Sequence, residues 1–252
     1  MKLTIRMLLL LAALLLMLPA SGEAALTFAD DLTGEYRYPE GSSDADALYI
    51  YRYRYPQIAG DSDVALHINT TYTYTAEDAL GFEAPMLASA MQPGDPQKVV
   101  DISYEVTCLT ADFLSLRIIK RVSIAGTETT VTSGQVIALT GSAAGKHVGL
   151  PVLLGLLKPD ETDEWLMNRQ TDKANRYARE MVWDRLQSGG DAWTIYDDLT
   201  LEEFEASFYP EEDFFLTEDG DLCFYMQSGV VAPEEFGEIH IVIRIEDLLD
   251  EM

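Results

Sequence analysis

Three consecutive runs in the middle of the chain alternate between apolar and polar residues, and they constrain the fold more than any other feature. The runs are Lys98–Leu109, Phe113–Ala125 and Thr127–Leu139, and they are rich in β-branched residues. This pattern is typical of strands with one buried face, and Gly126 suits a turn between the second and third runs. The sequence therefore predicts three adjoining β-strands.

An earlier run, Ala47–Tyr55, alternates even more strictly. Its tyrosines share one side of the predicted strand and lie at positions Tyr49, Tyr51, Tyr53 and Tyr55. Pro56 ends this strand or places it at the edge of a sheet, because proline has no backbone N–H to donate. The tyrosine row forms either one side of a core or an open binding face.

The segments around these strands carry weaker patterns. Residues 25–46 are rich in Asp, Gly and Ser, which predicts a flexible lead-in. Val64–Ile68 and Thr70–Thr75 carry β-formers, which predicts two further strands. Three prolines and a glycine between residues 84 and 97 predict a loop.

The C-terminal part has a different character. Apolar residues at helical spacing predict one long helix that begins after Asp160 or Thr162 and ends at Gln187. Thr200 and Glu203 form the pattern of a capping box, which predicts a second, short helix. Two aromatic runs around Glu218-Asp219-Gly220 predict a hairpin, and the alternating isoleucines from Ile239 to Ile245 predict a final strand.

These patterns predict an α+β fold with mainly antiparallel sheets and one long helix packed in the C-terminal half. We expect a β-rich N-terminal domain at residues 47–145 and an α+β domain at residues 146–252. The boundary falls in the glycine-rich segment Gly141–Gly145.

Residues 1–24 have the layout of a secretory signal peptide. Lys2 and Arg6 precede the apolar run Met7–Leu18, and Pro19 and several small residues follow it. The run has about 12 residues, against the roughly 20 that a membrane-spanning helix needs. We expect cleavage, and hence a secreted or extracytoplasmic protein with no stable membrane span. The alternative is an uncleaved leader that tethers the chain.

The chain is strongly acidic, with 43 Asp and Glu residues against 17 Lys and Arg residues and a formal charge of -26. This charge argues against nucleic acids and anionic membranes as partners, because both repel an acidic surface. It favours a cationic partner, or it serves only solubility.

The chain contains two cysteines, Cys108 and Cys223, each in an apolar, strand-like run. In an exported protein an even number of cysteines permits a disulfide. Two buried free thiols are the alternative.

The long predicted helix carries a concentration of basic residues at Arg169, Lys173, Arg176, Arg179 and Arg185. Trp183 lies opposite the apolar face of this helix, near Arg176 and Arg179. An exposed tryptophan beside arginines suits a sugar or a protein interface. The structural alternative is a buried Trp183 with the arginines paired to nearby acids.

No catalytic pattern is evident in the sequence, and no cofactor or metal site is predicted. The three histidines, His67, His147 and His240, lack the spacing of a helical zinc site. Acidic pairs are numerous, but a glycosidase needs two carboxyl groups held at a defined separation in a cleft. An envelope hydrolase that uses a carboxylate pair is therefore only the alternative.

The segment Phe214–Leu248 resembles the extracytoplasmic domain of RsiV-type anti-sigma factors. The resemblance rests on an aromatic strand, the Asp219-Gly220 turn, a second aromatic strand, Ala232-Pro233, Gly237 and an alternating strand. Tyr55-Pro56 and the residues after it resemble the partner domain, which also precedes the catalytic module of some peptidoglycan deacetylases. The Gly-Gly-Ala-His stretch that the family often carries is replaced here by Ile124–Thr127.

The resemblance implies a non-enzymatic binding domain of the bacterial cell envelope. The anti-sigma relatives recognise lysozyme, a cationic protein, so the expected partner is a lysozyme-like protein or peptidoglycan. We expect neither a sigma-binding segment nor a deacetylase module in this chain, which favours a binder over a receptor. A structural domain of a larger envelope assembly is a further alternative.

Overall fold

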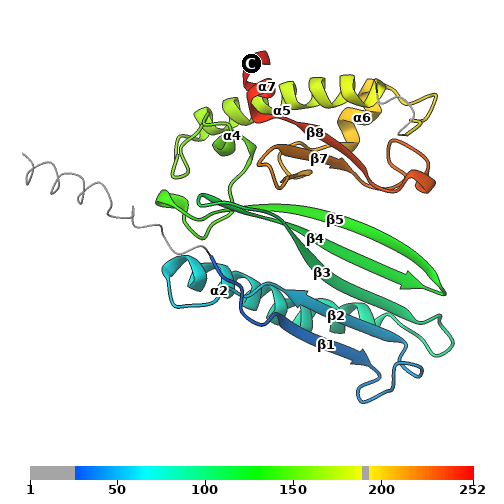
Figure 1. Cartoon of the computed structure of the whole chain (residues 1–252). Helices are drawn as coiled ribbons and strands as arrows, with labels where there is room; N and C mark the ends of the chain where they lie inside the picture. The colour runs from blue at the N-terminus through cyan, green and yellow to red at the C-terminus, as the bar shows by residue number, and fades with distance from the viewer. Residues whose placement is uncertain (1–25, 189–192) are drawn as a thin grey trace, which may run out of the picture.

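The computed structural model describes residues 26–188 and 193–252, so the expected leader at residues 1–24 lies outside the described residues. The described part contains two sheets with helices on their outer sides (Figure 1). This arrangement confirms the predicted α+β class with mainly antiparallel sheets. Among the described helices, none is both long and apolar enough to span a bilayer.

The larger sheet has five strands in the order β1-β2-β3-β4-β5. Its strands are β1 (Leu32–Tyr38), β2 (Tyr49–Tyr55), β3 (Lys98–Leu109), β4 (Phe113–Ile124) and β5 (Thr127–Ala138). The last three form the antiparallel strands that alternation predicts, with Ile124 opposite Thr127 across the turn at Gly126. All neighbours are antiparallel except β2 and β3, which are parallel.

The parallel pair needs a crossover connection, and helix α2 (Asp63–Asp78) supplies it. The prediction of strands at Val64–Ile68 and Thr70–Thr75 is therefore wrong. The buried side chains of α2 recur at helical spacing, at Ala65, Ile68, Tyr72 and Ala76. Ser62 caps the helix by accepting a hydrogen bond from the backbone N–H of Ala65 at 3.2 Å. Burial of this face outweighs the β preference of the threonines and tyrosines.

Two further predictions for the N-terminal half are wrong. The segment predicted as a flexible lead-in at residues 25–46 contains β1, which pairs with β2 along its whole length. The segment predicted as a loop contains α3 (Ala84–Ser89), which continues α2 through the π-helical turn η1 (Ala79–Glu83). Pro85 lies in the first turn of α3, directly after η1, and it has no backbone N–H to donate to a carbonyl of the preceding turn.

The smaller sheet is antiparallel and has the strand order β6-β7-β8. Its strands are β6 (Phe214–Leu216), β7 (Leu222–Met226) and β8 (Ile239–Ile243), which confirms the hairpin and the final strand. The predicted long helix is α5 (Glu164–Gln187), and Asp163 caps it rather than Asp160 or Thr162. Both bonds of the capping box are present at α6 (Leu201–Ser207).

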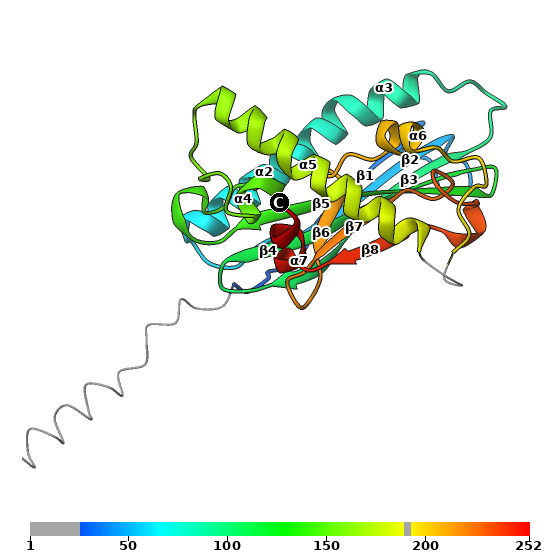
Figure 2. The ribbon, with the colours of Figure 1, turned by 90° about the horizontal axis from the view of Figure 1, so that it is seen from above.

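The short elements complete the chain and lie mainly around the smaller sheet. They are η2 (Gly141–Ala143), α4 (Leu150–Leu153), η3 (Glu234–Phe236) and α7 (Ile245–Glu251). Seen from above, α5 crosses over the smaller sheet with α7 beside it (Figure 2).

Two main cores result from this arrangement. One fills the space between α2 and the five-stranded sheet, and Tyr49, Tyr51, Tyr53, Tyr55 and Tyr72 belong to it. The other lies under α5 and contains Phe204, Phe208, Phe214 and Phe224. Helices α2 and α5 thus lie on opposite outer sides of the molecule (Figure 1). The proposed domain boundary near residue 145 stays a prediction, because β5 contributes Ile137 to the first core and Val136 to the second.

The two halves meet where the backbone of β6 crosses β5. A Cβ atom built on Gly134 would lie 1.8 Å from the carbonyl oxygen of Phe214, so only glycine fits there. The hydroxyl of Tyr225 accepts a hydrogen bond from the backbone N–H of Gly134 at 2.9 Å and donates to the carbonyl of Glu212 at 3.2 Å. The buried hydroxyl of Ser115 accepts from the N–H of Leu216 at 2.9 Å. These contacts fix the smaller sheet on the larger one, and we call them the seam.

Candidate binding surfaces

Helix α5 is held firmly on its inner face, which leaves its outer face available. Ala174, Ala178, Val182 and Leu186 are buried in the core of the C-terminal half. The two alanines allow the helix backbone to lie close to the sheet. The carboxylate of Asp163 accepts a hydrogen bond from the N–H of Leu166 at 3.2 Å and fixes the start of the helix. The first turns of α5 are therefore a rigid support for surface side chains.

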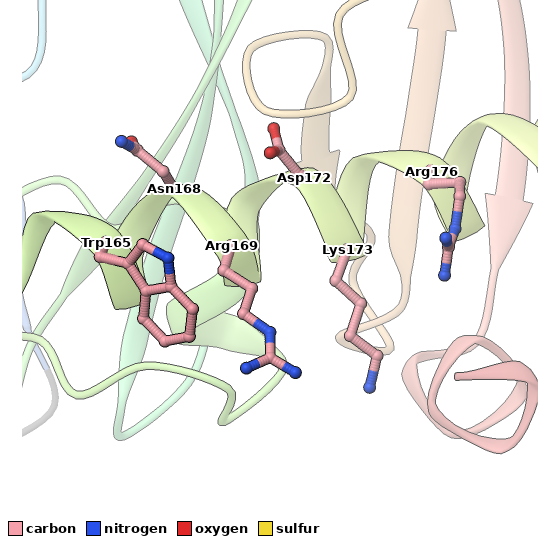
Figure 3. Close-up of a pocket in the computed structure, with 6 residues that line it drawn as sticks. All are labelled: Trp165, Asn168, Arg169, Asp172, Lys173 and Arg176. Atoms are coloured by element: carbon pink, nitrogen blue, oxygen red, sulfur yellow. The ribbon is translucent and has the colours of Figure 1, made fainter.

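One aromatic and three cationic side chains extend to the same side of α5 (Figure 3). We call this set the Trp165 stripe, and it comprises Trp165, Arg169, Lys173 and Arg176. The guanidinium carbon of Arg169 lies 5.2 Å from the centre of the Trp165 ring. A hollow of about 630 Å³ lies along the stripe and is also lined by Asn168 and Asp172.

The cations of the stripe have no carboxylate partner in the described residues, in contrast to many other basic residues of the chain. Within ranges 26–188 and 193–252, ion pairs are formed by Arg37, Arg52, Arg54, Arg117, Lys120 and Arg244. Like charges four residues apart on a helix repel each other, as Arg169 and Lys173 do here. The stripe therefore forms a local positive surface on an acidic protein.

The predicted cluster around Trp183 is not assembled as an exposed site. Trp183 is half-buried, and its ring packs 5.2 Å from that of Phe204. Arg179 donates from Nε to the carbonyl of Phe208 at 3.4 Å, whereas Arg176 lies over the ring of Tyr177 at 4.8 Å. Trp183 therefore packs on α6 as the structural alternative expected, but carboxylate partners for Arg176 and Arg179 are not found among the described residues.

The sequence did contain the signal for the exposed tryptophan. Trp165 lies four residues before Arg169, which places the two side chains on the same face of a helix. Its exposed fraction is 66%. The helical pattern alone did not distinguish it from Trp183, because α6 arrives from a distant part of the sequence and covers only the second of the two.

The tyrosine row forms a core and not an open binding face. Tyr49, Tyr51, Tyr53 and Tyr55 are all at most 8% exposed, and Tyr55 stacks on Tyr72 of α2 at 5.3 Å. Burial raises the pKa of Tyr49 to about 12, so its hydroxyl stays protonated. The sequence thus placed these residues on one side of a strand correctly, and α2 covers that side.

Cys108 and Cys223 are free and buried, so the possible disulfide is absent and the alternative of two free thiols is confirmed. Burial raises the pKa of both thiols, that of Cys223 to about 12 with a smaller contribution from Glu238. A thiol with such a pKa stays protonated at neutral pH and is a poor nucleophile.

The residues that carry the family resemblance have structural positions. Tyr55 and Pro56 are buried at the end of β2. Asp219 and Gly220 form the turn between β6 and β7, where Gly220 has a φ of +86°. Ala232 is buried, Pro233 precedes η3, and Gly237 ends η3 with a φ of +68°. These residues lie at a strand end, in a turn and in a loop.

Acidic residues are concentrated after α5. Residues 193–252 contain 18 Asp and Glu residues and a single basic residue, Arg244. Twelve of them lie in α6 and α7, in the β6–β7 turn and in η3. Within the described part of the chain, only Glu238 and Asp247 of this set take part in an ion pair. This region is therefore a strongly negative surface, and we call it the acidic C-terminal surface.

Among the carboxylates of this region, Asp213 has the most strongly shifted pKa. Burial raises its pKa to about 6, against the hydrogen bond that Oδ2 accepts from the N–H of Tyr209 at 2.8 Å. That hydrogen bond closes the turn before β6, so the geometry assigns Asp213 a structural role.

A partly buried charge network also crosses the seam. Glu238 contacts Arg117 of β4 at 2.8 Å and is hydrogen-bonded to His240. Burial alone would raise the pKa of Glu238, but the hydrogen bond from His240 and the charge of Arg117 lower it. In the described ranges, no group of three His, Cys, Asp or Glu side chains is placed to hold a metal ion.

Comparison with solved structures identifies the fold. A DUF3298 family member from Bacteroides fragilis NCTC 9343 matches with a TM-score of 0.52 and 15% identity, over 90% of this chain and 93% of that chain. A DUF3298 family protein from Pseudomonas aeruginosa PAO1 matches with a TM-score of 0.51 and 11% identity, over 88% and 92%. No family model and no curated protein matches the sequence. The chain therefore shares the fold of DUF3298 family proteins.

Proposed function

We propose that this chain is an exported, non-enzymatic binding protein of the bacterial cell envelope that recognises a cationic protein. The observation that carries the proposal is the acidic C-terminal surface, with 18 acidic residues against one basic residue. A surface of one sign accelerates association with a partner of the other sign and discriminates against partners of like charge.

The resemblance to the RsiV-type domain supports a lysozyme-like partner. The fold shared with DUF3298 family proteins is consistent with that resemblance. The leader-like pattern at residues 1–24 supports export. The structural positions of the buried thiols and of Asp213 support a binding role over a catalytic one.

The test is a binding titration of the purified protein with lysozyme over a series of salt concentrations. A second cationic protein of similar size, such as cytochrome c, measures the non-specific attraction. We expect lysozyme to bind at least tenfold more tightly, with affinity falling as salt screens the charges. Equal binding of both proteins, or no binding at low salt, would overturn the proposal.

A charge-matched pair of variants locates the surface. The test variant neutralises exposed acids of the C-terminal surface: Glu218→Gln, Asp219→Asn, Glu234→Gln and Glu235→Gln. The control variant neutralises four exposed acids elsewhere: Asp61→Asn, Glu77→Gln, Asp78→Asn and Glu128→Gln. The two variants have the same net charge, so they differ only in where the carboxylates were removed. The test variant should bind lysozyme more slowly than the control, because it loses charge on the proposed binding surface.

The alternative of an envelope hydrolase is examined with purified peptidoglycan. We expect the protein to release no soluble fragments from it. Release that is lost in Asp213→Asn, with the fold intact, would favour the hydrolase.

A further inference from the structure

The geometry of the Trp165 stripe fits an extended ligand. Its members are spaced by four, four and three residues, so they form a row of roughly 16 Å at 1.5 Å per residue. Figure 3 shows the side chains of Asn168 and Asp172 extending to the other side of the helix from the row, and both residues also line the hollow. A hollow of about 630 Å³ is within the size range of ligand sites, and it follows the helix surface.

The charges of the stripe indicate an anionic ligand. Arg169, Lys173 and Arg176 find no carboxylate among the described residues, although the chain carries 43 of them. Three neighbouring cations repel one another, and an anion placed along them would relieve this repulsion. The stripe is thus complementary to a ligand with several negative charges in a line.

Trp165 adds a requirement that charge alone does not explain. Trp165 is 66% exposed and presents a large apolar indole to solvent, with the guanidinium of Arg169 lying over its ring. Such a plane packs well against the C–H face of a sugar ring, while guanidinium and ammonium groups bind carboxylates or phosphates. An acidic polypeptide would use the cations but would have no particular need for the indole.

We propose that the Trp165 stripe binds a linear acidic polysaccharide, with one sugar ring on Trp165 and its acidic groups on Arg169, Lys173 and Arg176. The stripe has the opposite charge to the acidic C-terminal surface, whose helices α6 and α7 contact α5. The protein would then have two binding surfaces, one for a cationic protein and one for an anionic glycan.

The first experiment titrates the purified protein with oligogalacturonate, a linear sugar chain with one carboxylate per ring. Cellohexaose is the neutral control, and poly-glutamate is the control for an acidic polypeptide. Tryptophan fluorescence and calorimetry measure the affinity. Oligogalacturonate should bind at least tenfold more tightly than either control and should change the tryptophan emission.

The second experiment uses two pairs of variants. Trp165→Ala is compared with Tyr74→Ala, which removes a similarly exposed aromatic side chain from α2. Arg169→Gln with Lys173→Gln is compared with Arg121→Gln with Lys146→Gln, an equal change of charge at exposed sites elsewhere. The stripe variants should each lose about tenfold in affinity, and the controls should change less than twofold.

Three outcomes would overturn the proposal. The first is no binding of oligogalacturonate at low salt. The second is equal binding of poly-glutamate with no effect of Trp165→Ala, which would make the stripe a surface for acidic proteins, including a second copy of this chain. The third is an equal loss of affinity in the control variants. Lysozyme binding should be unchanged in Trp165→Ala, which separates this site from the proposed protein-binding surface.

Discussion

Both halves of the molecule pack a helix against one face of a sheet, but the side chains that fill the two cores differ. The N-terminal core is rich in tyrosine, and the C-terminal core uses phenylalanine and aliphatic residues. The hydroxyl groups in a tyrosine core need hydrogen-bond partners, and that of Tyr72 donates to Gln135 at 2.6 Å. The C-terminal core is mainly apolar, with Asn175 of α5 as a buried polar exception, and further polar contacts lie at the seam. The comparison shows that the same architecture is built with a tyrosine core in one half, where Tyr72 is hydrogen-bonded and the Tyr49 hydroxyl is not, and with a mainly apolar core in the other.

The largest expected effect comes from breaking the seam. Gly134→Val would place a side chain against the carbonyl oxygen of Phe214, and neither backbone can yield cheaply. We expect a loss of about 3 kcal/mol or more in the free energy of unfolding, measured by urea denaturation. Gly81→Ala is the control, because a Cβ there meets nothing within 4 Å. Normal stability of Gly134→Val would show that the halves are not fixed as described.

The next effect concerns a single hydroxyl at the seam. Tyr225→Phe leaves the N–H of Gly134 and the carbonyl of Glu212 without their partner. The expected cost is about 2 kcal/mol, because unpaired buried polar groups are expensive. Thermal denaturation measures it, and a change below about 0.5 kcal/mol would mean that water replaces the hydroxyl.

Within the tyrosine core, two substitutions should change the free energy of unfolding differently. Tyr72→Phe removes the hydrogen bond to Gln135 and should cost about 1 to 1.5 kcal/mol. Tyr49→Phe removes a buried hydroxyl without a hydrogen-bond partner and should be neutral or stabilising. Parallel chemical denaturation of the two variants tests this. Equal destabilisation would contradict the different hydrogen bonding of the two hydroxyl groups.

Asp213 should make the stability of the C-terminal half depend on pH. Its pKa is raised from 3.8 to about 6, so the folded state binds the proton more tightly than the unfolded state does. Stability is therefore lost as the pH rises from about 4 through 6. Asp213→Asn should be more stable than the wild type by roughly 1 kcal/mol at pH 7.5, after allowance for partial exposure, and should gain nothing at pH 4. Melting curves at both pH values measure the difference.

The smallest expected effects are at the helix caps of the two halves. Ser62→Ala removes the cap of α2, and Asp163→Ala removes the cap of α5. Each should lower the free energy of unfolding by about 0.5 to 1 kcal/mol. A much larger loss for one cap, measured under the same conditions, would show that this half governs the stability of the whole molecule.

The same contrast explains what the sequence could predict. The strands β3 to β5 and helix α5 follow from local periodicity, because each buries one face along its whole length. Helix α2 was missed because its threonines and tyrosines favour strands, and only the need to connect parallel strands reveals the helix. Strand β1 was missed because its sequence is polar, and only its pairing with β2 in the folded protein identifies it as a strand.

The candidate site shows the same limit. The cationic residues of α5 were identified from the sequence, but Trp183, which was grouped with them, packs on α6, whereas Trp165 is exposed. The choice between Trp165 and Trp183 depends on where α6 packs, and nothing local encodes that contact.

The two free thiols offer a means of timing the motions of the molecule. Cys108 lies in the core under α5, and Cys223 lies beside Phe215 and Tyr225 at the seam. Each is at most 3% exposed, so an alkylating reagent reaches it only when its surroundings open. The labelling rates of Cys108→Ser and Cys223→Ser proteins would then report the opening frequencies of the seam and of the core separately. The chain thus contains one natural labelling site in each of the two regions that hold the smaller sheet in place.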